Sequence, residues 1–407
     1  MTDVRTAMVI GGGIAGPVTA LALRRAGIEA TVYEAYEGNA DGVGGTMAIA
    51  PNGLDALDAV GAGELVAGLG QPITRTRVTD GAGRPIMGFD HLADLPPSRA
   101  LWRDRLYRAL HDHAAARGVP IVPGKRLVAT AEDDGAVTAT FADGGTARAD
   151  ILVGADGIHS TVRGLIDPAA PGPDRVPLLN LCGLSEYAPP NAHPTTTYFA
   201  FGRRGFLGYW VQPDGRTAWF ANVPFADPVL AEKLRATTSG EWLTRLRGIY
   251  ADDVPGRELM ARGDPATVAC LGWVDIMPRV PHWSRGRMVL VGDSVHAPSP
   301  SSGQGASLAA ESGVQLARCL RDLPDVPAAF AAYEGMRRGR VEKVAARASK
   351  TNNSKTVGPA AITMMRLVMP LMSRLFMTPE KTIGFEHRHR IDFDAPVEAP
   401  ALARAAR

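Results

Sequence analysis

The chain has 407 residues, of which 45 % are hydrophobic and 21 % are charged, and its formal net charge is only +2. This composition is that of a globular protein long enough for two domains, or for one large domain with an additional lobe. The near-neutral charge gives no electrostatic reason to expect a nucleic-acid partner. No apolar run reaches the roughly 18 residues that a membrane-spanning helix needs, so we expect no integral membrane segment.

The cysteines give no sign of a metal site or of a disulfide framework. Cys182, Cys270 and Cys319 lie far apart in the chain and match neither spacing. The first apolar run is too short for a secretory signal and ends in glycines. We therefore expect no bound metal and a reducing, cytoplasmic location.

The first 35 residues predict a nucleotide site. Residues 5–35 indicate a strand, a glycine turn, a helix and a second strand, and Gly11 to Gly16 reads G-G-G-I-A-G, which fits the pattern G-x-G-x-x-G. Such a turn brings the N–H groups at a helix N-terminus to a pyrophosphate. Glu34 ends the second strand, where a carboxylate can accept both hydroxyls of an adenosine ribose. The motif alone does not distinguish NAD from FAD.

The next segment alternates helical and strand-like patterns. Its last run, residues 151–153, is fully apolar, which is typical of a buried parallel strand. We expect a helix over 52–60 ending at Gly61, a hairpin over 74–90, a helix over 101–117, and strands over 136–141, 146–149 and 151–153.

From about residue 181 to 272 the pattern becomes that of an antiparallel sheet, with strands over 195–201, 206–211 and 216–223. We interpret this region as a substrate-binding lobe inserted into the nucleotide-binding domain. Tyr209, Phe220 and Asn222 are its candidate substrate contacts. Strand alternation places Tyr209 and Trp210 on opposite faces, but it does not decide which face borders a pocket.

A parallel-strand pattern returns at 287–291 and is followed by a loop and a long Ala-rich helix. The tail predicts a Met-rich helix over 364–377. Three roles are open for this helix: packing against the body, lining a pliable entrance for an apolar substrate, or contacting a membrane.

Two further motifs narrow the ligand. Asp156-Gly157 follows the buried strand, with Ser160 and Arg163 close behind, and Gly292-Asp293 follows the strand that ends at residue 291. Asp293 is suited to accept hydroxyls of a polyol chain. The N–H groups of 303–306 would face an electron-rich ring edge, such as that of a reduced flavin.

With these three motifs in this order over about residues 5–350, the chain resembles the FAD-dependent aromatic hydroxylases, the single-component flavoprotein monooxygenases similar to para-hydroxybenzoate hydroxylase. Arg103, in the run W-R-D-R-L, matches the family arginine near the flavin and the pyrophosphate. The chain departs from the family at Ser307, where asparagine is usual, and at Ser312, where aspartate is frequent.

The resemblance implies an α/β fold with a discontinuous Rossmann-like FAD-binding domain (1–73, 98–180 and 273–350). An α+β substrate lobe built on an antiparallel sheet (74–97 and 181–272) and C-terminal helices (351–407) would complete it. Asp156 would also serve NAD(P)H binding. The residues implied to hold a non-covalent FAD are Gly11, Gly13, Ile14, Ala15, Gly16, Glu34, Arg103, Leu127, Asp156, Asp293, Gly303, Gln304, Gly305 and Ala306.

The implied activity is that of a monooxygenase. NADPH or NADH reduces FAD, O2 forms a flavin C4a-hydroperoxide, and one oxygen atom passes to an aromatic or polycyclic small molecule by hydroxylation or epoxidation, as in natural-product tailoring or antibiotic modification. The flavin carries the chemistry. His296, Pro298 and Tyr209 are the candidate catalytic side chains, Pro298 is also a candidate substrate contact, and His296 equally fits a structural role.

An alternative is an FAD-dependent reductase or dehydrogenase that acts on a polyprenyl or other apolar substrate. The expected assembly is a monomer or a homodimer.

Overall fold

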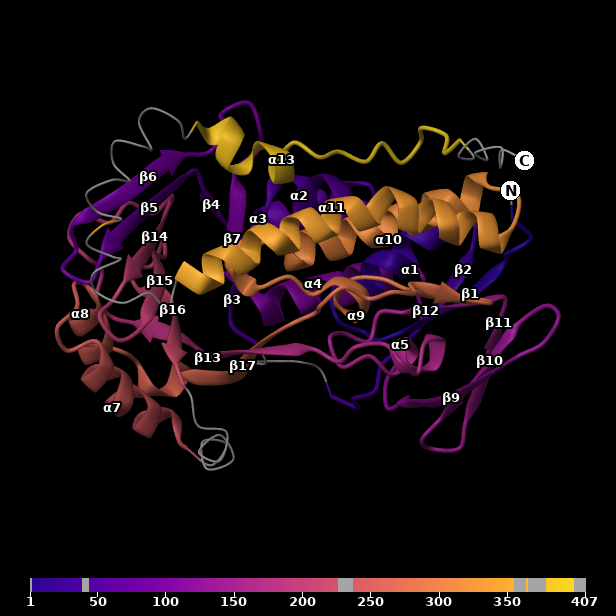
Figure 1. Ribbon diagram of the computed structural model, residues 1–407, viewed down its shortest axis with the longest axis horizontal. Helices are drawn as coiled ribbons and strands as arrows, with labels where there is room; N and C mark the ends of the chain where they lie inside the picture. Colours follow the sequence, from indigo (N-terminus) through magenta and orange to yellow (C-terminus); the bar gives the residue numbers. More distant parts are fainter. Residues whose placement is uncertain (1, 39–43, 226–236, 355–363, 365–377, 399–407) are drawn as a thin grey trace.

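The computed structural model describes residues 2–38, 44–225, 237–354, 364 and 378–398. Two large sheets lie toward opposite ends of an elongated molecule (Figure 1). The long strand β13 (Asp174–Ser185) and its partner β17 (Ala269–Ile276) run between these ends. Both strands extend across the boundaries that we predicted between the nucleotide-binding domain and the lobe, so the predicted division cuts through paired strands.

The nucleotide-binding sheet contains, within the described residues, six strands in the order β18-β19-β12-β1-β2-β8. Its central strands pair in parallel, and only the edge strand β18 runs antiparallel to its neighbour. The centre is apolar because a parallel sheet covered on both faces buries both sides of each strand. The strands are β1 (Thr6–Ile10), β2 (Glu29–Tyr33), β8 (Ile121–Val122), β12 (Ile151–Gly154), β18 (Ser284–Arg285) and β19 (Met288–Leu290).

The strand–turn–helix–strand unit predicted for the first 35 residues is confirmed: β1 leads through the glycine turn into α1 (Ala15–Arg25) and on to β2. Gly27, with φ +82°, ends this helix in the left-handed conformation that favours glycine. α1 packs against α10 (Gly305–Asp322), which packs against α11 (Val326–Ser354).

Two predicted helices differ in the structure. The helix predicted for 101–117 begins only at Arg103, because Leu101 and Trp102 belong to β7 (Ser98–Trp102) and pair with β3 (Thr46–Ile49). The single long helix expected after the 298–306 loop is two helices, α10 and α11. Pro324 lies between them, and a proline has no N–H with which to continue the helix.

The substrate sheet has, in the described part of the chain, seven strands in the order β17-β13-β16-β15-β14-β5-β6. The predicted antiparallel arrangement is confirmed, with one exception: β14 and β5 pair in parallel, because β5 comes from the separate 74–90 hairpin. One face of this sheet packs against α7 (Ser239–Ile249) and α8 (Gly256–Ala261). The remaining strands are β5 (Arg75–Asp80), β6 (Pro85–Asp90), β14 (Thr196–Phe201), β15 (Phe206–Val211) and β16 (Thr217–Pro224).

Smaller elements join the two sheets. The connecting sheet is β3-β7-β4, and the hairpin unit beside the nucleotide-binding sheet is β11-β10-β9. The additional elements are β4 (Gln71–Ile73), β9 (Leu127–Glu132), β10 (Val137–Phe141), β11 (Thr146–Ala149), α2 (Pro51–Asp58), α3 (Gly63–Leu69), α4 (Arg103–Ala116), α5 (Thr161–Ile166), α9 (Asp293–His296) and α13 (Phe385–His387).

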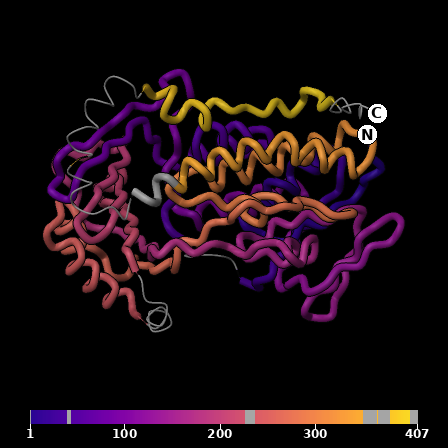
Figure 2. Tube along the Cα trace, viewed as in Figure 1, coloured from indigo at the N-terminus to yellow at the C-terminus, as the bar shows by residue number. Residues whose placement is uncertain are grey.

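The last described segment, residues 378–398, is called the tail from here on. It starts at the substrate lobe and runs alongside α11 and α10 toward the N-terminal end of the molecule (Figure 2). Hydrogen bonds from Arg318 and Arg321 to the carbonyls of Phe393 and Ala395 hold it to α10. The predicted Met-rich helix lies outside the described residues, except for Met364. None of the described helices combines the length and the apolar character needed to cross a bilayer.

Candidate active site

The glycine turn after β1 is closely packed against the chain at Gly11 and Gly16 and leaves open space at Gly13. Gly11 has φ +106°, and a Cβ there would lie 2.5 Å from the Ala155 carbonyl oxygen. A Cβ on Gly16 would lie 1.9 Å from the Gly11 carbonyl oxygen, whereas a Cβ on Gly13 would meet nothing within 4 Å. The first and last glycines are therefore required by the chain itself, and the middle one leaves room for a pyrophosphate at the helix N-terminus.

The end of β2 lies against this turn. The Glu34 carboxylate accepts the N–H of Gly12 at 2.5 Å and that of Tyr36 at 3.0 Å. The Lys125 N–H donates to the Glu34 carbonyl at 2.7 Å, and the buried Leu127 begins β9 two residues later. The residues predicted to contact the ribose and the adenine thus come together at one strand end.

Asp156 caps a helix. Its carboxylate accepts hydrogen bonds from the Ser160 hydroxyl at 2.5 Å and from the N–H groups of Thr161 and Val162 at 2.7 and 3.1 Å, which caps the first turn of α5. Burial raises the pKa of this carboxyl, and these hydrogen bonds lower it in part. Arg163 then donates to the Ser294 carbonyl at 2.9 Å, so the Asp156-Gly157 motif is joined to the Gly292-Asp293 motif.

Asp293 and Arg103 present opposite charges to the same part of the interior. Desolvation raises the pKa of Asp293 and the charge of Arg103 lowers it in part, yet the Asp293 side chain is exposed. Within the described residues, the Arg103 guanidinium forms no hydrogen bond or ion pair. The aliphatic part of the Arg103 side chain lies against Gly44, where a Cβ would be 2.9 Å from Arg103 Cδ.

The loop from 298 to 306 ends in the N-terminus of α10. Gly303 has φ +62°, and Cβ atoms on Gly303 or Gly305 would meet nothing within 4 Å. The first turn of an α-helix leaves its N–H groups without partners in the helix and favours a negative charge there. With the open glycine turn and the exposed Asp293, this loop completes a set of residues that fits FAD from its adenosine to its ring.

A cavity of about 670 Å³ lies between this loop and the substrate sheet. Its walls are the sheet face opposite α7 and α8, the 300–304 segment, α11 near Arg347, and tail residues 382–387. Most of the cavity surface is apolar, and six Phe and Trp side chains line it. They are Phe89, Phe199, Phe201, Phe206, Trp210 and Phe220.

The structure brings some of the predicted substrate contacts to this cavity. Phe220 and Asn222 line it. Tyr209 does not, because it belongs to the opposite face, where it is buried against the α7 side and stacks on Tyr198 with ring centroids 5.0 Å apart. Pro298 is buried and does not line the cavity, so neither Tyr209 nor Pro298 is positioned to contact a substrate there.

His296 has a structural partner. Its Nε2 lies 2.8 Å from the Ser312 hydroxyl, and burial, together with the nearby Arg337, lowers the pKa of His296 to about 3. The imidazole is therefore neutral near pH 7, and it does not line the cavity. This geometry favours the structural role over that of a catalytic base.

Sequence reasoning missed the polar end of the cavity. Arg347 forms an ion pair with Glu386 at 2.8 Å, and His91 lies 3.1 Å from the Thr76 hydroxyl and edge-on to His387. These residues come from α11, the tail and the 74–90 hairpin, and no local pattern relates the three segments. His111 was also missed: its Nε2 contacts the Gly12 carbonyl from α4 and supports the glycine turn.

Comparison with known proteins agrees with this geometry. Residues 3–348 match the family model described as FAD binding domain. An FAD-dependent urate hydroxylase from Klebsiella pneumoniae is 32% identical over 84% of this chain and 88% of its own length. The aurachin C monooxygenase/isomerase of Stigmatella aurantiaca is 29% identical over 82% of this chain and 85% of its length.

The fold is also similar to a solved structure. Klebsiella pneumoniae HpxO complexed with FAD and uric acid superposes with a TM-score of 0.80 at 26% identity, and the match covers 93% of this chain and 95% of HpxO.

Proposed function

The chain belongs to the FAD binding domain family and is an FAD-dependent monooxygenase, and we propose that it takes its electrons from NADPH or NADH and oxygenates a neutral, multi-ring aromatic substrate. The observation that carries the proposal is the cavity of about 670 Å³, which has the 300–304 loop on one wall and an aromatic sheet face on another. A cavity with mostly apolar walls and a few polar groups is typical of sites for drug-sized organic molecules.

The residues of this chain would bind and orient FAD without supplying its chemistry. In the proposal, the glycine turn and Arg103 hold the pyrophosphate, Glu34 holds the adenosine ribose, Asp293 holds the ribityl hydroxyls, and the first turn of α10 faces the ring. When bound and reduced by NADPH or NADH, FAD would supply the two electrons with which one atom of O2 enters the substrate and the other leaves as water. The cavity walls exclude water and place the substrate beside the ring.

The residues that line the cavity favour a neutral substrate with several aromatic rings over a small acidic purine such as uric acid. Among the described lining residues the one arginine is Arg347, and it is engaged by the Glu386 carboxylate and the Thr382 carbonyl. Desolvation lowers the pKa of His91. Desolvation and the nearby positive groups lower the pKa of His387. Neither imidazole therefore carries a charge near pH 7. A buried anion without a free cation is unfavourable, whereas fused aromatic rings fit the Phe and Trp surfaces.

The test starts from purified protein. FAD is identified by mass spectrometry after heat release, and oxidation of NADPH and NADH is then followed with multi-ring phenols and quinolones, with uric acid as the comparison. We expect a multi-ring compound to stimulate O2 uptake and to acquire one isotopically labelled oxygen atom from labelled O2. If uric acid alone stimulated O2 uptake and were itself hydroxylated, the proposed substrate class would be contradicted. Product formed without O2 would contradict the oxygenation itself.

A further inference from the structure

One buried carboxylate lies at the junction of several elements behind the cavity. Glu311, in the middle of α10, is fully buried, and its oxygens accept hydrogen bonds from Asn52 Nδ2 at 2.6 Å and Arg337 Nη1 at 2.6 Å. Arg340 adds two more bonds, from Nε and Nη2, each at 2.8 Å. A buried charge persists only when it is paired and hydrogen-bonded as fully as this one.

One set of contacts leads from Glu311 to the loop proposed to hold the flavin ring. The Asn52 Nδ2 that donates to Glu311 also donates to Gln304 Oε1 at 2.9 Å. Gln304 is 2% exposed, lines the cavity and directly precedes the first turn of α10. The position of this loop therefore depends on where Glu311 holds Asn52.

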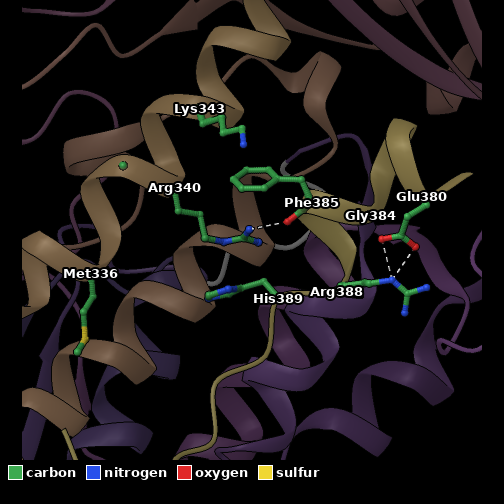
Figure 3. A pocket seen from close by; sticks show the side chains of 9 residues that line it. Met336, Arg340, Lys343, Glu380, Gly384, Phe385, Arg388 and His389 are labelled. Carbon is green, nitrogen blue, oxygen red and sulfur yellow. Dashed lines mark hydrogen bonds and ion pairs between the residues drawn. The ribbon is translucent and has the colours of Figure 1, made fainter. Parts of the chain in front are cut away.

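A second set of contacts leads from Glu311 to the tail. Arg340 donates to the carbonyls of Phe385 and Glu386, each at 2.9 Å. Figure 3 shows the bond to Phe385, with the Arg340 side chain lying between α11 and the tail. Glu386 and His387 line the same cavity as Gln304.

We propose that Glu311 is a positioning residue that couples the tail wall of the substrate cavity to the loop that holds the flavin ring. A network of charge-assisted hydrogen bonds as dense as that around Glu311 has few alternative arrangements, so a displacement of the tail moves Arg340 and is transmitted through Glu311 and Asn52 to Gln304. Substrate contact with the tail then changes how tightly the ring is held. The inference rests on the proposed position of the ring beside 303–306.

A double-mutant cycle on FAD affinity tests this coupling. Asn52→Ala removes the contact with the loop. Arg340→Lys keeps a positive charge beside Glu311, but the three donors of a lysine cannot replace the four hydrogen bonds that Arg340 makes to the carboxylate and the two carbonyls. The dissociation constant of FAD is measured on the apoprotein by flavin fluorescence. We expect each variant to weaken binding several-fold, and the loss in the double variant to be smaller than the product of the two by at least about threefold.

The matched control is Arg388→Met. Arg388 holds the same tail through Asp94 and Glu380, and Figure 3 shows it pointing away from Arg340. Arg388→Met leaves in place the bonds by which Arg340 holds the Phe385 and Glu386 carbonyls to Glu311, so its effect is expected to multiply independently with that of Asn52→Ala. Independent effects of Arg340→Lys and Asn52→Ala would overturn the coupling while leaving the position of the ring intact.

Two further measurements separate the possible failures. If neither Asn52→Ala nor Gly305→Val changes FAD affinity, the ring does not lie at this loop, and its proposed position fails together with the coupling. Hydrogen exchange of the unaltered protein needs no variant to fold. We expect FAD binding to slow exchange at residues 385–387, and unchanged exchange there would overturn the proposal.

Discussion

The two halves of the active site are built from different parts of the chain. The cofactor half is made mainly of backbone, with the glycine turn after β1, the end of β2 and the first turn of α10. The substrate half is made of side chains on one face of the antiparallel sheet, completed by the 74–90 hairpin and the tail. The first depends on glycines at fixed places, and the second depends on which face each side chain occupies.

The largest expected effect is on the free energy of unfolding. It comes from substitutions at two neighbouring positions of β16, which face opposite sides of the substrate sheet. Trp219 is fully buried on the α7 side, whereas Phe220 lines the cavity. Trp219→Ala removes a large core side chain, so we expect it to lower the free energy of unfolding by about 3–5 kcal/mol. Urea denaturation of the FAD-loaded protein measures the loss.

Phe220→Ala is the matched control for this test. We expect a clearly smaller loss of stability, because the Phe220 ring borders a cavity, together with a raised KM for any multi-ring substrate identified. Equal losses of stability for the two variants, with KM unchanged in Phe220→Ala, would show that the cavity face is ordinary core.

This contrast explains what the sequence could predict. The nucleotide site was predictable because its signal is local: a short strand, glycines at fixed spacing, and an acidic residue at the next strand end. Strand alternation predicted that Tyr209 and Trp210 point in opposite directions, but the location of α7 and of the tail decides which of them meets the cavity. That decision is made by packing between segments distant in sequence, for which one sequence carries no local pattern.

The same reasoning explains Asp156. Its motif follows β12 as predicted, but the Asp156 carboxylate caps α5, a use that depends on how the following residues turn. Ser312, a departure from the family pattern, connects His296 with Arg337, and this contact is visible only when α10 and α11 are packed together.

The second prediction addresses the cofactor half through Gly16→Ala. A Cβ at Gly16 would lie 1.9 Å from the Gly11 carbonyl oxygen, so the turn and α1 must move apart. We expect a loss of roughly 1–3 kcal/mol in the stability of the protein, as for overpacked sites, along with weaker FAD binding. Thermal unfolding of the apoprotein and of the FAD-loaded protein measures both effects.

Gly13→Ala distinguishes an effect on the stability of the fold from an effect on FAD binding. A Cβ on Gly13 has nothing within 4 Å, so the apoprotein should unfold at nearly the temperature of the unaltered protein. The methyl group would occupy the space proposed for the pyrophosphate, and we expect FAD affinity to fall at least about tenfold, or about 1.4 kcal/mol. Unchanged affinity, measured by flavin fluorescence, would contradict the proposed path of the pyrophosphate.

The smallest expected effect is on the pH dependence of stability, and it tests whether the cofactor half and the substrate half unfold together. Burial holds the pKa of His296, in the cofactor half, and of His387, in the cavity wall, near 3 instead of the ordinary 6.5. Between these values the unfolded chain binds a proton that the folded chain does not, so stability falls as the pH drops below about 6.5. Each histidine contributes up to about 1.4 kcal/mol per pH unit.

Replacing either histidine by glutamine should therefore flatten the acid limb of the stability profile, measured by urea denaturation from pH 7 to pH 5. If the halves unfold as one cooperative unit, His296→Gln and His387→Gln flatten the same transition by similar amounts. Two separable transitions, each flattened by only one of the variants, would show that the halves fold independently. An acid limb as steep as that of the unaltered protein in both variants would contradict the neutral, buried state of these side chains.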